Sequence, residues 1–175
     1  MRIPTILTGI LFSAVAFAAT PITVDSVDLN RYMGDWYEIA SLPQPFSAGC
    51  TCTRAQYATQ ADGTVSVYNT CSAGSPQGAL SEARGVATVA DATTKAKLSV
   101  KFENSPVAGD YWIIGLDPAY NWAVVSNADG TSLWILSRTP ILDEEMYKQA
   151  LEVATRNQID LTNLTLTHQN SCLYP

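Results

Sequence analysis

The chain has few of the side chains on which most catalysis and metal binding depend. Its 175 residues include a single histidine, His168, so the sequence offers no second imidazole for a catalytic pair or a histidine-based metal site. It also has no glycine-rich phosphate-binding loop and no nucleophile-elbow serine. We therefore expect no catalytic residue, no cofactor and no metal, and we expect His168 to be exposed or on an edge strand.

Positive charge is scarce as well. Charged residues make up only 15% of the chain, with 10 Lys and Arg against 16 Asp and Glu and no cluster of basic residues. The formal net charge of −6 disfavours binding to nucleic acids and to anionic membrane surfaces. With 47% hydrophobic residues, however, the chain is able to bury a sizeable core.

The longest apolar run lies at the N-terminus and is typical of a signal peptide. Arg2 supplies a positive start, Ile3 to Phe17 is almost wholly apolar, and Ala16-Phe17-Ala18 has the small-x-small form of a cleavage site. A membrane helix needs ~20 apolar residues and this run is shorter, so an uncleaved membrane anchor is the less favoured alternative. The chain has no cysteine near the cleavage point, which argues against a lipid-anchored lipoprotein. The sequence predicts a signal peptide over residues 1–18 and a single domain over residues 19–175.

The chain has four cysteines: Cys50, Cys52, Cys71 and Cys172. An even number in an exported chain predicts two disulfides, with three pairings open. Zinc is a poor alternative because one residue separates Cys50 from Cys52, where zinc sites usually have two to four.

Short segments with strand character follow one another along most of the chain. Turns rich in Gly, Asn, Asp and Pro separate them at hairpin length. The predicted strands lie within Asp28–Phe46, Thr53–Thr59, Thr64–Cys71, Glu82–Val89, Lys97–Phe102, Tyr111–Leu116, Trp122–Ser126 and Leu133–Arg138. This succession predicts an all-β fold, an eight-stranded up-and-down antiparallel barrel.

One helix interrupts the strands. Between Pro140 and Asn157, Met146, Ala150 and Ala154 recur at helical spacing, which predicts an amphipathic α-helix packed outside the barrel. A last short strand is predicted over Leu161–Gln169, followed by a tail that carries Cys172.

Alternation along the strands predicts which side chains share a face. The sets that share one are Trp36, Glu38 and Ala40; Thr53, Ala55 and Tyr57; Val65, Val67 and Asn69; and Leu98, Val100 and Phe102. A buried Glu38 must be protonated or paired, and we expect a partner such as Arg54 or backbone amides. The pattern assigns no face to Tyr111 and Trp112.

Three segments carry a family resemblance. Gly34-Asp35-Trp36 in the first strand, Leu116-Asp117-Pro118-Ala119-Tyr120 between two later strands, and Trp134 to Pro140 before the helix match the three signature segments of lipocalins in order and spacing. From about Asp28 onward the chain resembles the branch that holds apolipoprotein D and the bacterial outer-membrane lipocalin.

The resemblance implies an eight-stranded calyx with a closed end and an open mouth. It gives Gly34, Trp36 and Arg138 structural roles, with the guanidinium of Arg138 packed across the indole at the closed end. It also implies a disulfide between Cys52 and Cys172, which leaves Cys50 to pair with Cys71.

The ligand site also follows from the resemblance. Residues that line the apolipoprotein D pocket correspond here to Tyr57, Asn69, Phe102 and Trp134, which also fall on predicted inward faces, and we expect them nearer the open end than Trp36. An inward amide such as Asn69 would lack hydrogen-bond partners in a dry core, which favours a ligand role.

The implied function is that of a secreted protein, extracellular or, in a bacterium, periplasmic. It would bind and transport a small hydrophobic ligand such as a fatty acid, another lipid, a retinoid, a sterol or a pigment, with no nucleic-acid partner and no stable membrane anchor. The alternative is a lipocalin-fold enzyme of the isomerase or de-epoxidase type. A siderophore is disfavoured because few cations are predicted on the inward faces. The sequence does not indicate an oligomeric state.

Overall fold

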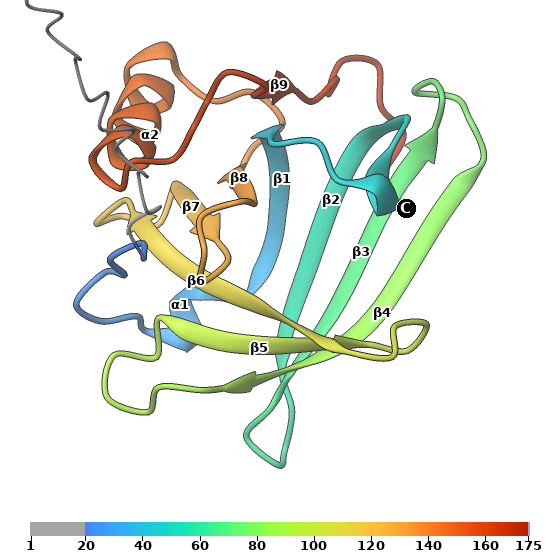
Figure 1. Cartoon of the computed structure of the whole chain (residues 1–175). Coiled ribbons are helices and arrows are strands. Elements are labelled where there is room, and N and C mark those ends of the chain that lie inside the picture. The colour runs from blue at the N-terminus through green and yellow to red at the C-terminus, as the bar shows by residue number, and fades with distance from the viewer. Residues whose placement is uncertain (1–19, 175) are drawn as a thin grey trace, which may run out of the picture.

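The strands follow one another around a closed ring (Figure 1). The structure, a computed structural model, describes residues 20–174, so the predicted signal peptide over residues 1–18 lies outside the described residues. The strands are β1 Gly34–Ser41, β2 Cys50–Thr59, β3 Val65–Ala73, β4 Leu80–Val89, β5 Lys97–Phe102, β6 Ala108–Leu116, β7 Trp122–Ser126, β8 Leu133–Ser137 and β9 Thr165–Leu166. Strand β1 pairs antiparallel with both β8 and β2, which closes the ring of β1 to β8, and β9 adds to β1. The predicted eight-stranded antiparallel barrel is confirmed.

Several strand limits differ from the prediction. Strand β2 begins at Cys50 and β6 at Ala108, each three residues earlier than expected, because backbone pairing continues where the side chains no longer alternate. The predicted last strand over Leu161–Gln169 contracts to β9, which pairs only with Ala40 and Ser41.

Two short helices were not predicted. Helix α1, Leu29–Tyr32, precedes β1, and the 3₁₀ helix η1, Pro45–Ser47, follows it. Asp28 begins α1 by accepting hydrogen bonds from the backbone N–H groups of Asn30 and Arg31. This turn sets the buried side chain of Tyr32 beneath the barrel, where it forms part of the floor.

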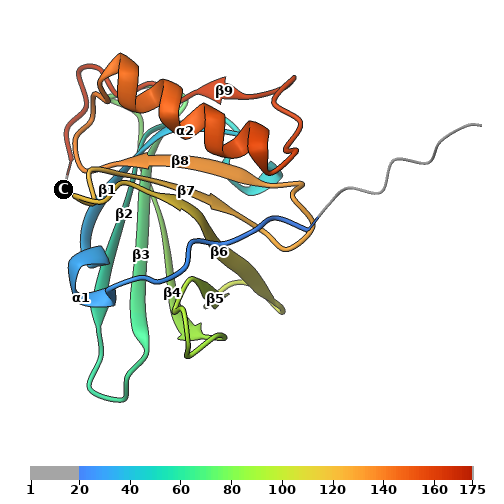
Figure 2. The ribbon, with the colours of Figure 1, turned by 90° about the vertical axis from the view of Figure 1, so that its left-hand side faces the viewer.

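The predicted outer helix is α2, Glu144–Arg156, capped at its start by the carboxylate of Asp143. It lies against the outer face of β6 to β8 (Figure 2), and its buried side chains are those of Ala150, Val153 and Ala154. A Cβ on Gly115 would lie 2.7 Å from Cγ1 of Val153, so this glycine permits the close approach of helix and sheet. Strand β7 is consequently buried on both faces.

The prediction that Ala40 shares a face with Trp36 and Glu38 is wrong. A β-bulge between Glu38 and Ala40 shifts the register against β8, and Ala40 packs in the outer cluster under α2. One extra residue in a strand reverses the facing of every side chain beyond it, and simple alternation cannot anticipate this.

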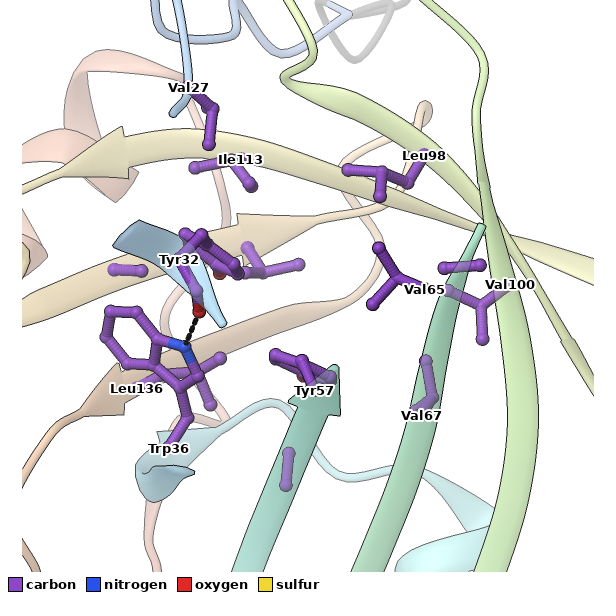
Figure 3. Close-up of a cluster of buried hydrophobic side chains, with 14 of the residues drawn as sticks. Val27, Tyr32, Trp36, Tyr57, Val65, Val67, Leu98, Val100, Ile113 and Leu136 are labelled. Atoms are coloured by element: carbon purple, nitrogen blue, oxygen red, sulfur yellow. Dashed lines mark hydrogen bonds between the residues drawn. The ribbon is translucent and has the colours of Figure 1, made fainter. Parts of the chain in front are cut away.

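The closed end is built around Trp36 and Arg138. The guanidinium carbon of Arg138 lies 3.8 Å from the indole centroid of Trp36, whose Nε1 donates to the carbonyl of Tyr32 at 2.8 Å (Figure 3). The same guanidinium donates, at 2.6 to 3.3 Å, to the backbone carbonyls of Arg31, Met33, Asp35 and Tyr120. Gly34 has φ +96°, and a Cβ there would lie 3.4 Å from Nη1 of Arg138. Arg138 thus joins α1, the start of β1 and the β6–β7 turn.

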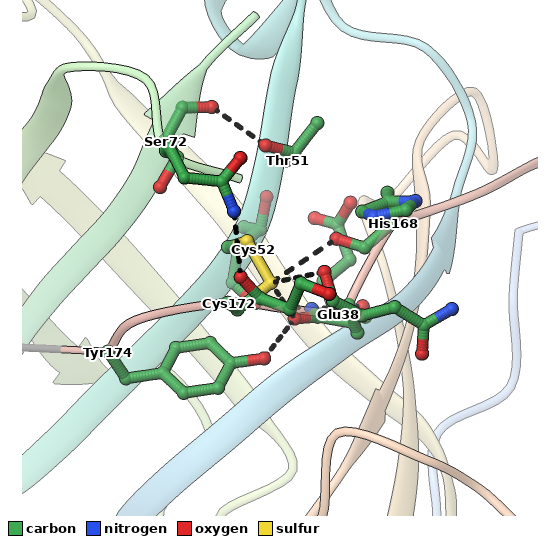
Figure 4. Close-up of a disulfide and its surroundings, with 12 residues drawn as sticks. Glu38, Thr51, Cys52, Ser72, His168, Cys172 and Tyr174 are labelled. Atoms are coloured by element: carbon green, nitrogen blue, oxygen red, sulfur yellow. Dashed lines mark hydrogen bonds between the residues drawn. A yellow bond between two sulfur atoms is a disulfide. The ribbon is translucent and has the colours of Figure 1, made fainter. Parts of the chain in front are cut away.

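The C-terminal tail fills the seam between β1 and β2. The strands pair only from Gly34 to Tyr37, and beyond that the Gln169 amide donates to the carbonyls of Glu38 and Thr53 at 2.7 and 2.8 Å. The structure joins Cys52 to Cys172 by a disulfide (Figure 4), and a second disulfide joins Cys50 to Cys71. The first of these fixes the tail to the barrel wall.

Arg138→Lys keeps the charge but loses the planar fork that reaches several carbonyls at once. We expect the free energy of unfolding to fall by about 2–4 kcal/mol, because partly buried carbonyls lose charge-assisted hydrogen bonds. Guanidinium chloride unfolding measures the change. The matched control is Arg156→Lys, at an exposed position on α2 that should change stability by less than about 0.5 kcal/mol. Equal effects of the two variants would contradict the role given to Arg138.

The disulfides should differ in their contribution to stability because their loops differ in length. The closures span 120 residues for Cys52–Cys172 and 21 for Cys50–Cys71. Loop entropy alone gives about 4.9 and about 3.3 kcal/mol. We expect the double variant Cys52→Ala/Cys172→Ala to unfold more easily than Cys50→Ala/Cys71→Ala by about 1.5 kcal/mol or more. The reverse order in thermal and denaturant unfolding would show that the tail is not anchored as described.

Candidate functional site

The barrel encloses a cavity of about 830 Å³. Much of its wall comes from β2 to β5, where Val65, Val67, Leu98 and Val100 present apolar side chains (Figure 3). On β4 the wall includes small side chains, among them Ala83 and Ala87. Small residues on one wall leave room that larger side chains would fill, and the volume lies within the range of small-molecule sites.

All four residues predicted to contact ligand line this cavity: Tyr57, Asn69, Phe102 and Trp134. Phe102 ends β5, and Trp134 lies opposite Ser41 at the last register position of β1, so both are near the open end. Asn69 lies midway along β3, opposite Ala55 and Ala83. Its Oδ1 is buried and has no hydrogen-bond partner among the described residues.

Tyr57 lies deeper in the cavity than the other three residues. Its ring centroid lies 6.1 Å from that of Tyr32 and 5.9 Å from that of Tyr111, at the floor of the cavity. Our expectation that it would lie towards the open end is therefore wrong for this residue. The reason is that β2 runs from the mouth down to the closed end, so a residue late in the strand is deep.

Two further residues of the floor, Tyr32 and Tyr111, were not predicted as site residues. The hydroxyls of Tyr32 and Tyr111 lie 2.8 Å apart, and the Tyr111 hydroxyl donates to that of Tyr57 at 3.2 Å. Burial raises the pKa of Tyr57 to about 12 and the pKa values of Tyr32 and Tyr111 well above their ordinary value, so all three stay neutral. Trp112 points outwards, where the Lys97 ammonium lies over its ring at 3.9 Å.

Phe102 owes its place in the wall to a glycine. Gly85 is its register partner on β4, and a Cβ at this glycine would lie 3.0 Å from Cδ1 of Phe102 and 2.8 Å from the carbonyl oxygen of Lys101. Any larger residue at Gly85 would therefore displace the phenyl ring or the neighbouring strand. Sequence alternation identified Phe102 but not the residue that makes space for it.

Glu38 is a buried carboxylate in the cavity wall, 9% exposed. Its Oε1 accepts hydrogen bonds from the hydroxyls of Ser41 at 3.0 Å and Thr167 at 2.5 Å, where the sequence predicted Arg54 or backbone amides. Burial raises the pKa of this carboxyl group, although the two hydroxyls oppose the shift. Thr167 reaches Glu38 only because the tail returns to the seam beside β1.

The mouth is apolar at two loops. Phe46, in η1, and Val107, between β5 and β6, are 78% and 70% exposed and both lie on the cavity rim. The entrance to the cavity therefore presents apolar side chains.

Two findings concern the cysteines and possible metal ligands of the described residues. All four cysteines of the chain are held in disulfides, so none is free to act as a nucleophile. Within residues 20–174 no group of three or more His, Cys, Asp or Glu side chains is arranged to hold a metal ion. Over the same residues, no helix has the length and apolar character needed to cross a membrane.

Known structures share this architecture. Insecticyanin from the tobacco hornworm Manduca sexta superposes with a TM-score of 0.69 at 24% identity, covering 89% of this chain and 88% of that one. Lobster apocrustacyanin A1 gives a TM-score of 0.67 at 22% identity, covering 90% and 94%. At these identities the likeness establishes the fold.

Several relatives are closer in sequence. Temperature-induced lipocalin-1 of Arabidopsis thaliana is 39% identical over 155 residues, 84% of this chain and 82% of that protein. Outer membrane lipoprotein Blc of Escherichia coli K12 is 36% identical over 146 residues, covering 83% and 81%. Apolipoprotein D of Cavia porcellus is 33% identical over 159 residues, covering 87% and 82%.

A family model described as a lipocalin-like domain matches residues 27–169, which include every strand of the barrel, α2 and β9. Together with the closed barrel and the relatives at 33–39% identity, this match shows that the chain belongs to the lipocalin family.

Proposed function

We propose that this protein binds a small hydrophobic molecule in the barrel cavity and transports it outside the cytoplasm. The observation that carries the proposal is the cavity of about 830 Å³ with apolar walls and an apolar rim. A ligand that loses about 300 Å² of apolar surface from water gains roughly 7.5 kcal/mol before the costs of binding. No chemical step is needed.

The wall residues offer the ligand two kinds of contact, apolar and polar. Phe102 and Trp134 supply flat apolar area near the mouth, suited to an aliphatic chain or a ring system. Asn69, with a buried oxygen that has no partner among the described residues, supplies a polar contact midway down. The candidate ligands for such a wall are fatty acids, other lipids, retinoids, sterols and pigments.

Export is part of the proposal. The signal sequence over residues 1–18 would direct residues 19–175 out of the cytoplasm as a single domain, either to the extracellular space or to the periplasm. The two disulfides support this, because they form and persist in oxidising compartments.

A binding role is favoured over an enzymatic one. An enzyme that uses a cavity cysteine is unsupported because Cys50, Cys52, Cys71 and Cys172 all form disulfides. His168 is exposed on the tail and is not among the residues that line the cavity.

Filling the cavity should weaken binding while leaving the barrel folded. Ala83→Phe places a phenyl group on the inner face of β4, and its matched control, Val86→Phe, places one on the outer face of the same strand, where Val86 is 40% exposed. We expect Ala83→Phe to weaken uptake of the hydrocarbon fluorophore diphenylhexatriene at least about 10-fold, because it occupies the ligand volume. Val86→Phe should bind as the unaltered protein does. Equal binding by both variants would place the ligand elsewhere.

Secretion makes a second, separate prediction. Expressed in full from a host with a secretory pathway, the protein should leave the cytoplasm and begin at Ala19, because Ala16-Phe17-Ala18 precedes the cut. Intact-mass analysis of the exported protein measures the new N-terminus. An Ala16→Arg/Ala18→Arg variant should remain uncleaved. Cytoplasmic protein that still carries residues 1–18 would refute the export route while leaving the cavity proposal intact.

A further inference from the structure

Three tyrosine hydroxyls form a hydrogen-bonded chain at the cavity floor. The Tyr111 hydroxyl donates to Tyr57 at 3.2 Å, so the 2.8 Å contact between Tyr32 and Tyr111 must be donated by Tyr32. The order of donation is therefore Tyr32 to Tyr111 to Tyr57. The hydroxyl hydrogen of Tyr57, at the end of the chain, has no acceptor among the described residues.

Tyr57 presents this remaining donor at the floor of the cavity, next to apolar side chains. Tyr57 is 8% exposed and borders the cavity, with Val65 and Val67 on the neighbouring strand (Figure 3). In such surroundings a hydroxyl without an acceptor destabilises the protein, and a ligand that supplies an acceptor removes this penalty and so binds more tightly. The site thus favours a hydrogen-bond acceptor on the deepest part of the ligand.

The charges around the cavity disfavour an anionic group there. Among residues 20–174 the lining includes the acidic residues Glu38, Glu82 and Asp110 and one basic residue, Arg54. The Arg54 guanidinium lies over the Tyr174 ring of the tail at 5.7 Å. Arg138 lies behind the floor, with its donors directed at backbone carbonyls. A carboxylate at the floor would lose its hydration without gaining a cation, which is unfavourable.

We propose that the hydroxyl of Tyr57 orients the ligand, and that the cavity selects elongated apolar molecules whose leading end carries an uncharged acceptor, such as a ketone, aldehyde or ester carbonyl. This inference rests on the proposed binding function and specifies its ligand class. Tyr111 and Tyr32 act as positioning residues that direct the Tyr57 proton into the cavity. The neutral state of all three phenols, kept by burial, agrees with this role.

The test compares ligands of one chain length in competition with diphenylhexatriene, which has no acceptor. We expect dodecan-2-one to bind at least about 10-fold more tightly than dodecanoate at neutral pH, because only the ketone offers a neutral acceptor. Tyr57→Phe should weaken binding of the ketone about 5- to 10-fold, the value of one hydrogen bond, and leave diphenylhexatriene unchanged.

Three further measurements keep the result specific. Tyr147→Phe, on α2 outside the barrel, should change no affinity. Tyr111→Phe removes the hydroxyl that directs the Tyr57 proton into the cavity, so it should weaken ketone binding, by less than Tyr57→Phe does, and leave diphenylhexatriene unchanged. With [2-¹³C]dodecan-2-one, the carbonyl carbon should shift downfield on binding to the unaltered protein and shift less in Tyr57→Phe, which a purely structural role would not produce.

The outcomes separate the two proposals. Diphenylhexatriene bound equally by all proteins, together with a ketone affinity that Tyr57→Phe does not alter, would overturn the Tyr57 inference and leave the binding function standing. Dodecanoate bound as tightly as the ketone would overturn it too. An unaltered protein that takes up neither the hydrocarbon nor the ketone would refute both.

Discussion

The position of the Arg138 guanidinium is the constraint on which the rest of the barrel depends. It stacks on Trp36 and donates to carbonyls of segments on either side of the closed end, so α1, the start of β1 and the β6–β7 turn are held by one side chain. Because this end is fixed, Tyr32 is held under the barrel as a floor. A cavity needs a floor that does not move, and here a cation–π contact and charge-assisted hydrogen bonds provide it.

The buried core has two parts, and only the inner part borders the cavity. One buried cluster surrounds Trp36 inside the barrel, and a second lies outside, between the sheet and α2, with Val124, Ile135 and Ala150 at its centre. Apolar side chains packed between α2 and the sheet therefore form part of the hydrophobic core outside the barrel. Small residues on β4, such as Ala83, then leave space inside the barrel at little cost to the fold.

The regular parts of the fold could be predicted from the sequence, and the irregular parts could not. A period of two placed Asn69 and Phe102 on the inner wall because their strands are unbroken up to those positions. Ala40 was misplaced because its strand contains a bulge. Tyr111 had no assigned face because residues 111–114 are all apolar, so polarity does not mark the face, although these side chains alternate between the inner and the outer cluster. The contact of Glu38 with Thr167 depends on the path of a tail 129 residues away, which no local pattern encodes.

The central claim is that the barrel holds a small hydrophobic molecule, and native mass spectrometry of the protein purified from its own source tests it most directly. The account predicts a species heavier than the bare chain by the mass of one small ligand, which organic extraction removes and a hydrophobic extract of the same source restores. A spectrum of bare chain alone, unchanged after exposure to that extract, would contradict it.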